Sequence, residues 1–221
     1  CMLIYPERNW KVFTNKMMID IIGEHVLPFL MSHILWQANV ELEPGFADDF
    51  QKYLSQLDRV KVGRLKTSFN RDSSEFPLYP RYEEVFEKIL KDLGLYGVVS
   101  YYADLWGQLY DKDSTGHEWH SHFSGSEILS WVHFLKIPEQ RCFFFLNSDG
   151  DKIYPKHQSQ NDMIVFPSWA IHGVDPLENP DDTRVVTAGN IVLTSYGPGD
   201  QELVQTKFEN TTLWVNKNEE C

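Results

Sequence analysis

The part of the sequence that follows Gly94 is a series of short apolar runs, and this pattern restricts the possible folds more than any other feature of the chain. The runs are rich in β-branched and aromatic residues and are separated by turn-forming residues, which is typical of strands. The segment Asn147–Gly150 (NSDG) has the composition of a hairpin-type turn. The predicted strands are Val98–Tyr110, Leu129–Ile137, Cys142–Leu146, Lys152–Tyr154, Met163–Phe166, His172–Val174 and Val185–Thr194. Closely spaced strands without intervening helices predict an antiparallel sandwich or jelly roll rather than a parallel sheet.

Two amphipathic helices are predicted before Gly94, because apolar residues recur there at the spacing of one helix face. The apolar positions are Phe50, Tyr53, Leu54 and Leu57 in the first helix, and Val85, Phe86, Ile89, Leu90 and Leu93 in the second. Between them, the polar segment Lys66–Pro80 is predicted to be a loop, either a simple connection or a lid.

We therefore expect a mainly β protein with N-terminal helices and a cupin-like jelly-roll core, also called a double-stranded β-helix. Within a single domain (1–221), a helical support region (1–94) precedes the jelly-roll core (95–196) and a C-terminal extension (197–221).

The composition indicates a globular protein that folds without a metal or a disulfide. The chain has 221 residues, 42% of them hydrophobic, and a chain of roughly this length buries about 70% of its unfolded surface. Its three cysteines, Cys1, Cys142 and Cys221, are too few and too scattered for a disulfide framework or a thiolate metal site. Any metal is therefore expected to serve function rather than folding, and a reducing, cytoplasmic location is expected.

The acidic net charge of the chain argues against nucleic acids and anionic membranes as binding partners. Twenty basic residues against 32 acidic ones give a formal net charge of −12, and such a surface repels phosphate backbones and anionic lipid headgroups. The most apolar early stretch (17–31) contains Asp20, Glu24, His25 and Pro28, so neither a signal peptide nor a spanning helix is predicted. No nucleic-acid or membrane partner is expected.

Three of the eight histidines fall within the segment His117–His122, which reads HEWHSH. If this segment is extended, its two-residue period places Glu118, His120 and His122 on one face and His117 on the other. Two imidazoles at adjacent same-face positions can bind one metal ion. The alternative is that they are surface histidines in a polar loop.

A third candidate ligand follows at His172, where an apolar strand passes through a proline turn and a new strand begins. In a jelly roll that strand can lie beside the one that carries His120 and His122, and three imidazoles can then form a facial triad with open coordination positions. Arg184 begins the apolar run after His172. A charge at the start of a core strand needs an anionic partner, which is either a bound ligand or an acidic side chain of the chain itself.

The segment from Trp106 to Asn190 resembles the small oxygenases of the iron(II)/2-oxoglutarate superfamily found in marine bacteria and cyanobacterial viruses. Their pattern is an aromatic-rich strand, an HxH pair, a Ser-x-x-x-[YF]-L strand, an FPSW-x-x-H segment, and then an arginine and an asparagine. The matching residues here are Trp106 and Tyr110, His120 and His122, Ser130 with Phe134-Leu135, Phe166–Trp169 with His172, and Arg184 and Asn190. The match covers about 85 of the 221 residues in one unbroken order.

The resemblance implies an Fe(II)- and 2-oxoglutarate-dependent dioxygenase, a hydroxylase that forms succinate while it oxidises a second substrate. It implies His120, His122 and His172 as iron ligands and Arg184 as the group that binds the distal carboxylate of 2-oxoglutarate, because a guanidinium can hold a carboxylate bidentately. It also implies Tyr110 as a second contact for the cosubstrate. The usual triad of the superfamily is two histidines and one carboxylate, so the histidine at position 122 departs from it.

Two other interpretations remain open at this point. A cupin would bind its metal through four ligands, His120, His122, Glu127 and His172. However, the cupin pattern has a glycine two residues after the proline, where this chain has Trp169, and it gives no role to Arg184. A non-enzymatic structural or interaction jelly roll would keep the metal only as a staple or lose it, and iron and 2-oxoglutarate would leave its melting temperature unchanged.

The sequence does not identify the prime substrate, which can be a small molecule or a side chain of a protein or peptide. It leaves the oligomeric state open as well, with a homodimer among the alternatives. Trp106, Trp119 and Trp169 are expected to help exclude water from the site.

Overall fold

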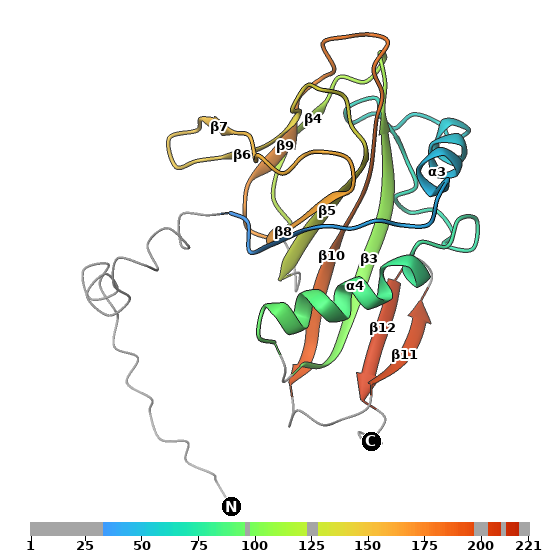
Figure 1. The fold of residues 1–221 in the computed structure, drawn as a ribbon, viewed down its shortest axis with the longest axis vertical. Coiled ribbons are helices and arrows are strands. Elements are labelled where there is room, and N and C mark those ends of the chain that lie inside the picture. The colour runs from blue at the N-terminus through green and yellow to red at the C-terminus, as the bar shows by residue number, and fades with distance from the viewer. Residues whose placement is uncertain (1–32, 96–97, 123–127, 197–202, 209–210, 217–221) are drawn as a thin grey trace, which may run out of the picture. The chain divides into compact units, whose positions relative to one another are not determined.

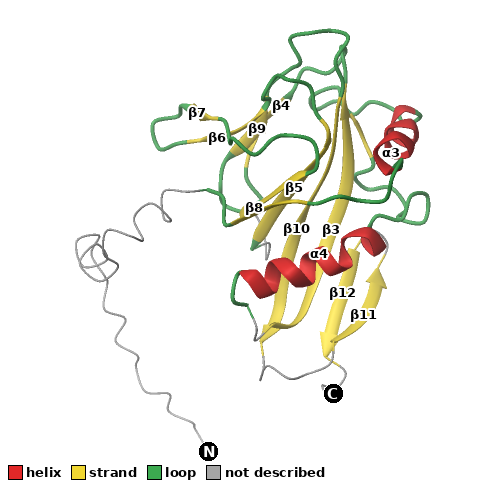
Figure 2. Ribbon diagram, in the orientation of Figure 1, coloured by secondary structure: helices red, strands yellow, loops and turns green. Residues whose placement is uncertain are grey.

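The computed structural model describes residues 33–95, 98–122, 128–196, 203–208 and 211–216. By its contacts the chain divides into two units, residues 1–33 and 34–221, and the description that follows concerns the second. This unit is built mainly of antiparallel strands, with two helices among the described residues (Figures 1 and 2). None of the described helices has the length and apolar character needed to cross a membrane.

The strands form a larger and a smaller sheet, and all the pairings between them are antiparallel. The larger sheet contains, in spatial order, β1 (Trp36–Asn39), β8 (Asp162–Pro167), β5 (Leu129–Lys136), β10 (Arg184–Tyr196), β3 (Val98–Tyr110), β12 (Thr211–Asn216) and β11 (Leu203–Phe208), and β2 (Lys66–Thr67) also pairs with β3. The smaller sheet contains β4 (His117–His120), β9 (His172–Val174), β6 (Phe143–Leu146) and β7 (Lys152–Ile153).

The mainly antiparallel β architecture predicted from the sequence is confirmed. Each of the seven predicted strands is present, with bounds within two residues of those expected. The strands β1, β2, β4, β11 and β12 were not among the predicted strands, although an extended conformation was considered for the segment that contains β4. The pair β11 and β12 lies in the region predicted as a C-terminal extension and continues the larger sheet beyond β3.

The two predicted helices are also present, as α3 (Phe46–Ser55) and α4 (Tyr79–Asp92). They pack on one face of the larger sheet, where Phe50 of α3 and Tyr82 and Phe86 of α4 are fully buried in one hydrophobic cluster with Trp131 of β5. Figure 1 shows α4 running across β10 and β3. Gly107 of β3 permits this packing, because a Cβ at that position would lie 2.1 Å from Cζ of Phe50.

A second hydrophobic cluster fills the space between the two sheets. Its members come from both sheets and include Phe134, Phe143, Phe145, Phe166 and Val186. Burial of each such side chain stabilises the fold by about 1.5–3 kcal/mol. One face of the larger sheet therefore packs on the helices and the other on the smaller sheet, and the candidate site lies on this second face.

Candidate metal centre and carboxylate pocket

A cavity of about 470 Å³ is lined by residues of both sheets and of the segment that connects α3 to β2. Its polar lining includes His120, His122, His172, Arg184 and Asn190. The sequence-predicted ligand candidates and the predicted carboxylate-binding arginine therefore face one common space.

Three histidines converge in this cavity. His120 is the last residue of β4 and His172 the first residue of β9, and the two are paired across the smaller sheet. His122 follows β4, and its backbone N–H donates to the carbonyl oxygen of Ser168 at 2.8 Å. One ligand nitrogen of each imidazole lies within 4.8 Å of those of the other two, so a single ion between them can contact all three.

The hydrogen bonds of the rings determine which nitrogen faces the ion. Nδ1 of His120 lies 2.9 Å from the carbonyl oxygen of Glu118, and Nδ1 of His172 lies 2.9 Å from that of Ala170. A carbonyl oxygen can only accept, so each Nδ1 carries the proton and each Nε2 keeps a free lone pair. Metal-bound histidines are commonly oriented by such a hydrogen bond from the second nitrogen.

Burial of two of the rings, His120 and His172, favours the neutral form that a metal requires. Burial lowers the pKa of His120 and lowers the pKa of His172 well below the usual value for histidine. Three imidazoles that present nitrogen donors suit a divalent first-row transition metal, Fe(II) included. The residues present therefore fit the metal that the sequence predicts.

The prediction for His117 was wrong. This side chain also lines the cavity, and its ring centroid lies 4.5 Å from that of His120. The β4–β9 ladder has a register shift between His117 and His120, so strict alternation of faces does not hold along this strand. His117 does not belong to the group of converging ligand nitrogens, and burial lowers its pKa to about 4.

Arg184 is the first residue of β10, and it is 1% exposed. Among the described residues neither Nη1 nor Nη2 has a hydrogen-bond partner, and no salt bridge within that part of the chain includes this guanidinium. An acidic side-chain partner for Arg184, one of the two alternatives that the sequence allowed, is thus not found among the described residues. Burial lowers the pKa of Arg184, but an arginine remains charged at any physiological pH.

Tyr110 lies beside Arg184 in the β3–β10 register, and the Arg184 Cζ atom is 4.9 Å from the centroid of its ring. Its hydroxyl donates to Oε1 of Gln108 at 2.9 Å, and Gln108 lines the cavity. Burial raises the pKa of Tyr110 to about 12. The ring therefore supports the guanidinium, and the hydroxyl is already hydrogen-bonded within the protein.

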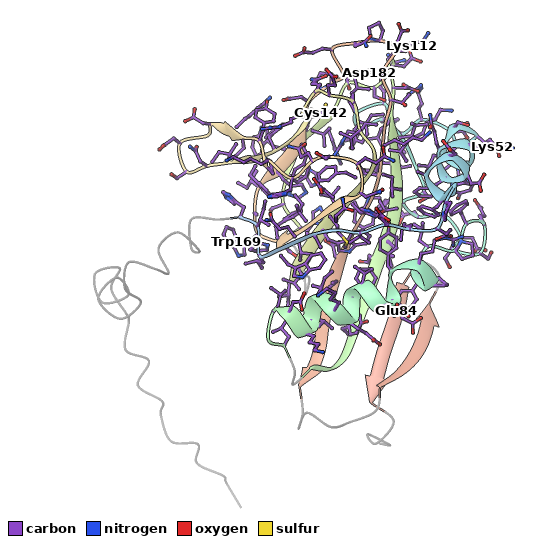
Figure 3. All side chains as sticks on the ribbon, in the orientation of Figure 1. Lys52, Glu84, Lys112, Cys142, Trp169 and Asp182 are labelled. Atoms are coloured by element: carbon purple, nitrogen blue, oxygen red, sulfur yellow. The ribbon has the colours of Figure 1, made fainter. Side chains whose placement is uncertain are left out.

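Of the three tryptophans expected near the site, only Trp106 lines the cavity. Trp119 is 62% exposed, and Trp169 (labelled in Figure 3) is 54% exposed; both expectations were wrong. The sequence analysis missed Val60, Val62 and Phe69, which line the cavity and are partly exposed. These residues are brought to the cavity by tertiary packing, and no local sequence motif predicts that they line it. The rings of Phe69 and Trp106 pack edge to face, with their centroids 5.2 Å apart.

The fourth ligand required by the cupin interpretation, Glu127, lies outside the described residues. The remaining three ligands of that interpretation are the converging histidines. Arg184, for which the cupin pattern gives no role, lines the same cavity.

Comparisons with known proteins show a similar fold in three solved structures. No family model and no curated protein sequence matches the chain. Among solved structures, an oxidoreductase of the 2OG-Fe(II) oxygenase family from Burkholderia pseudomallei is 14% identical, with 78% of this chain and 90% of that chain covered and a TM-score of 0.55.

Two further solved structures are similar. The non-heme alpha ketoglutarate dependent epimerase SnoN from nogalamycin biosynthesis is 12% identical, with 84% of this chain and 90% of that chain covered and a TM-score of 0.55. A prolyl-4-hydroxylase from Pseudomonas putida is 14% identical, with 77% and 98% covered and a TM-score of 0.51. At these identities the likeness establishes a shared fold.

Proposed function

We propose that this protein is an Fe(II)- and 2-oxoglutarate-dependent dioxygenase that couples decarboxylation of 2-oxoglutarate to succinate with oxidation, most simply hydroxylation, of a second substrate. The observation that carries the proposal is Arg184. A buried guanidinium whose Nη1 and Nη2 have no hydrogen-bond partner among the described residues costs several kcal/mol, and it lines the cavity in which three imidazoles converge. A dicarboxylate that reaches both the metal and the guanidinium satisfies both groups.

The strand order supports a double-stranded β-helix as the core. The pairs β3 with β10, β4 with β9, β5 with β8, and β6 with β7 are nested inside one another along the chain. Successive pairs lie in alternate sheets, in the order larger, smaller, larger and smaller. Such nesting is expected of a jelly roll, and the similarity in fold to solved 2-oxoglutarate oxygenases supports the same core.

Each residue of the site has a distinct role in the proposal. His120, His122 and His172 hold the metal through Nε2, and Arg184 binds the distal carboxylate of 2-oxoglutarate with its planar pair of N–H groups. Tyr110 packs against the guanidinium and keeps it in place. When bound, the metal supplies the activation of oxygen, while the protein supplies geometry and a site shielded from water.

The walls of the cavity also suit a reaction that must exclude water. Trp106 is 9% exposed and covers the space beside His122, with 6.2 Å between the two ring centroids. Val60, Val62 and Phe69 give the cavity an apolar, partly exposed side. The second substrate, whether a small molecule or a side chain of a protein or peptide, would approach along this side.

Succinate formation tests the proposal. The full chain, loaded anaerobically with Fe(II) and supplied with 2-oxoglutarate, should release succinate slowly on exposure to oxygen even without the second substrate. His172→Ala should abolish the release, and His157→Ala, at an exposed histidine outside the cavity lining, should leave it unchanged. If iron-loaded protein forms no succinate above the level of free iron at any 2-oxoglutarate concentration, the site is a three-histidine metal site without this activity.

A further inference from the structure

The three converging histidines are not held in the same way. The Nδ1 atoms of His120 and His172 face main-chain carbonyl oxygens two residues earlier in their own segments. Nδ1 of His122 instead lies 2.5 Å from Oδ1 of Asn190, a side-chain oxygen on β10. The orientation of His122 therefore depends on a side chain that is 68 residues away in the sequence.

Asn190 belongs to a small buried polar cluster. Ser130 of β5 is opposite Asn190 in the strand register, and its hydroxyl lies 2.9 Å from Asn190 Oδ1 and 3.1 Å from Ser168 Oγ. The same hydroxyl lies 3.2 Å from His122 Nδ1. Ser130 and Ser168 are at most 1% exposed and Asn190 is 7% exposed. Polar groups buried to this degree are retained at a cost in desolvation that their hydrogen bonds must offset.

We propose that Asn190 is the positioning residue for His122. Its side-chain oxygen accepts a hydrogen bond from Nδ1–H and thereby keeps the proton off Nε2, the nitrogen that faces the metal. With the amide reversed, its NH₂ group would donate to Nδ1, the proton would move to Nε2, and the lone pair for the metal would be lost. A carboxylate ligand has no tautomer to fix, so this role follows from having a histidine at position 122.

The inference about the metal rests on the proposed function, but the inference about the tautomer does not.

The protein also contains a reference for the opposite tautomer. Nε2 of His133 donates to the carbonyl oxygen of Val40 at 3.0 Å, and its Nδ1 lies 2.8 Å from the hydroxyl of Tyr82. His133 should therefore carry its proton on Nε2, unlike His122.

The test is long-range ¹H–¹⁵N NMR of the metal-free full chain labelled with ¹⁵N-histidine, at a slightly alkaline pH, with signals assigned by single histidine replacements. We expect Nδ1–H for His120, His122 and His172, and Nε2–H for His133. In Asn190→Leu, which is similar in size but cannot accept, His122 should shift toward Nε2–H while His120 and His172 stay unchanged. In Asn190→Asp, which accepts like the native oxygen, Nδ1–H should be retained.

Anaerobic Fe(II) binding is the second readout. Loss of a hydrogen bond that orients a metal-bound histidine typically weakens metal binding 10–100-fold, so we expect this loss in Asn190→Leu and its rescue in Asn190→Asp. Thr187→Val is the matched control, because Thr187 is a buried polar residue on the same strand that bonds to Tyr82 rather than to the site; it should leave Fe(II) affinity unchanged.

Two results would overturn the inference. One is wild-type protein in which His122 carries its proton on Nε2. The other is an Asn190→Leu variant with an unchanged His122 tautomer and unchanged iron affinity. If Asn190→Leu does not fold, the wild-type tautomer and the Asn190→Asp variant still decide. If the protein forms no succinate but shows the expected tautomers, the proposed function fails and the role of Asn190 stands.

Discussion

Both faces of the larger sheet bury polar groups, and the hydrogen bonding of Tyr82 on one face differs from that of Arg184 on the other. On the face covered by the helices, the hydroxyl of Tyr82 contacts His133 Nδ1 and Thr187 Oγ1, and His133 Nε2 donates to a carbonyl oxygen. On the cavity face, Nη1 and Nη2 of Arg184 have no partner among the described residues. The first network stabilises the fold by itself, whereas the second set of groups reduces stability until a ligand binds.

The largest effect is expected at the metal centre. Replacing His172 by alanine removes one of the three proposed ligands, at the position paired with His120 in the smaller sheet, so stoichiometric Fe(II) binding should be lost in anaerobic equilibrium dialysis. His117→Ala should keep one iron per chain, because His117 lines the cavity outside the converging group. Wild-type affinity in both His120→Ala and His172→Ala would disprove the ligand assignment.

Arg184→Leu should separate cosubstrate binding from stability. We expect iron binding to persist and 2-oxoglutarate binding, measured by calorimetry, to weaken by about 2–5 kcal/mol, the usual cost of removing one partner of a buried charged pair. The free energy of unfolding of the ligand-free variant should be unchanged or higher, by up to about 4 kcal/mol, because an unpaired buried charge is removed.

Lys136→Leu provides the control for Arg184→Leu, since Lys136 forms a partly exposed ion pair with Asp48 outside the cavity lining. Its 2-oxoglutarate affinity should equal that of the wild type. A strongly destabilised Arg184→Leu variant with normal 2-oxoglutarate affinity would show that the guanidinium has a structural partner instead.

The helix-covered face should show its effect in the pH dependence of stability. Burial lowers the pKa of His133 to about 4, so between this value and about 6.5 the unfolded chain binds the additional proton. Stability from this residue is therefore fully present above that window and falls as the pH decreases through it, by up to about 3 kcal/mol. Denaturant unfolding of wild type and His133→Gln at several pH values measures the difference, and parallel curves would contradict it.

The smallest effect is expected for Tyr110→Phe. The ring that packs against Arg184 is kept, and the lost hydroxyl bonds to Gln108 within the protein. Because the lost hydrogen bond is made within the protein, the 2-oxoglutarate affinity should fall by at most about 0.5–1.5 kcal/mol, the net value of one hydrogen bond. A loss as large as that of Arg184→Leu would instead show that the hydroxyl binds the cosubstrate directly.

The sequence predicts the strands well because their β-branched and aromatic runs are bounded by clear turn residues. It does not predict β1 and β2, which are only four and two residues long, and it misplaces His117 because a register shift in β4 is set by pairing with β9. Local periodicity cannot reveal a feature that depends on a partner strand.

The candidate site, like the fold, was predicted in part: its motif residues were identified from the sequence, and the residues around them were not. Motif order singles out His120, His122, His172 and Arg184, and the structure brings these four residues to one cavity. The role of Asn190 toward His122 could not be derived, because it requires the β5–β10 register that places Ser130 opposite Asn190. The apolar side of the cavity could not be derived either, since Val60 and Phe69 reach it through the packing of a segment without regular periodicity.

The central claim is that one cavity binds iron through three histidines and 2-oxoglutarate through Arg184. The most direct measurement is anaerobic addition of Fe(II) and then 2-oxoglutarate to the full chain, with visible spectroscopy to detect the weak charge-transfer band of a chelated 2-oxo acid. We predict a band that requires both additions, saturates at one 2-oxoglutarate per chain, and is absent from His172→Ala and from Arg184→Leu at the same concentrations. Binding of one iron per chain with no such band at any 2-oxoglutarate concentration would contradict the claim.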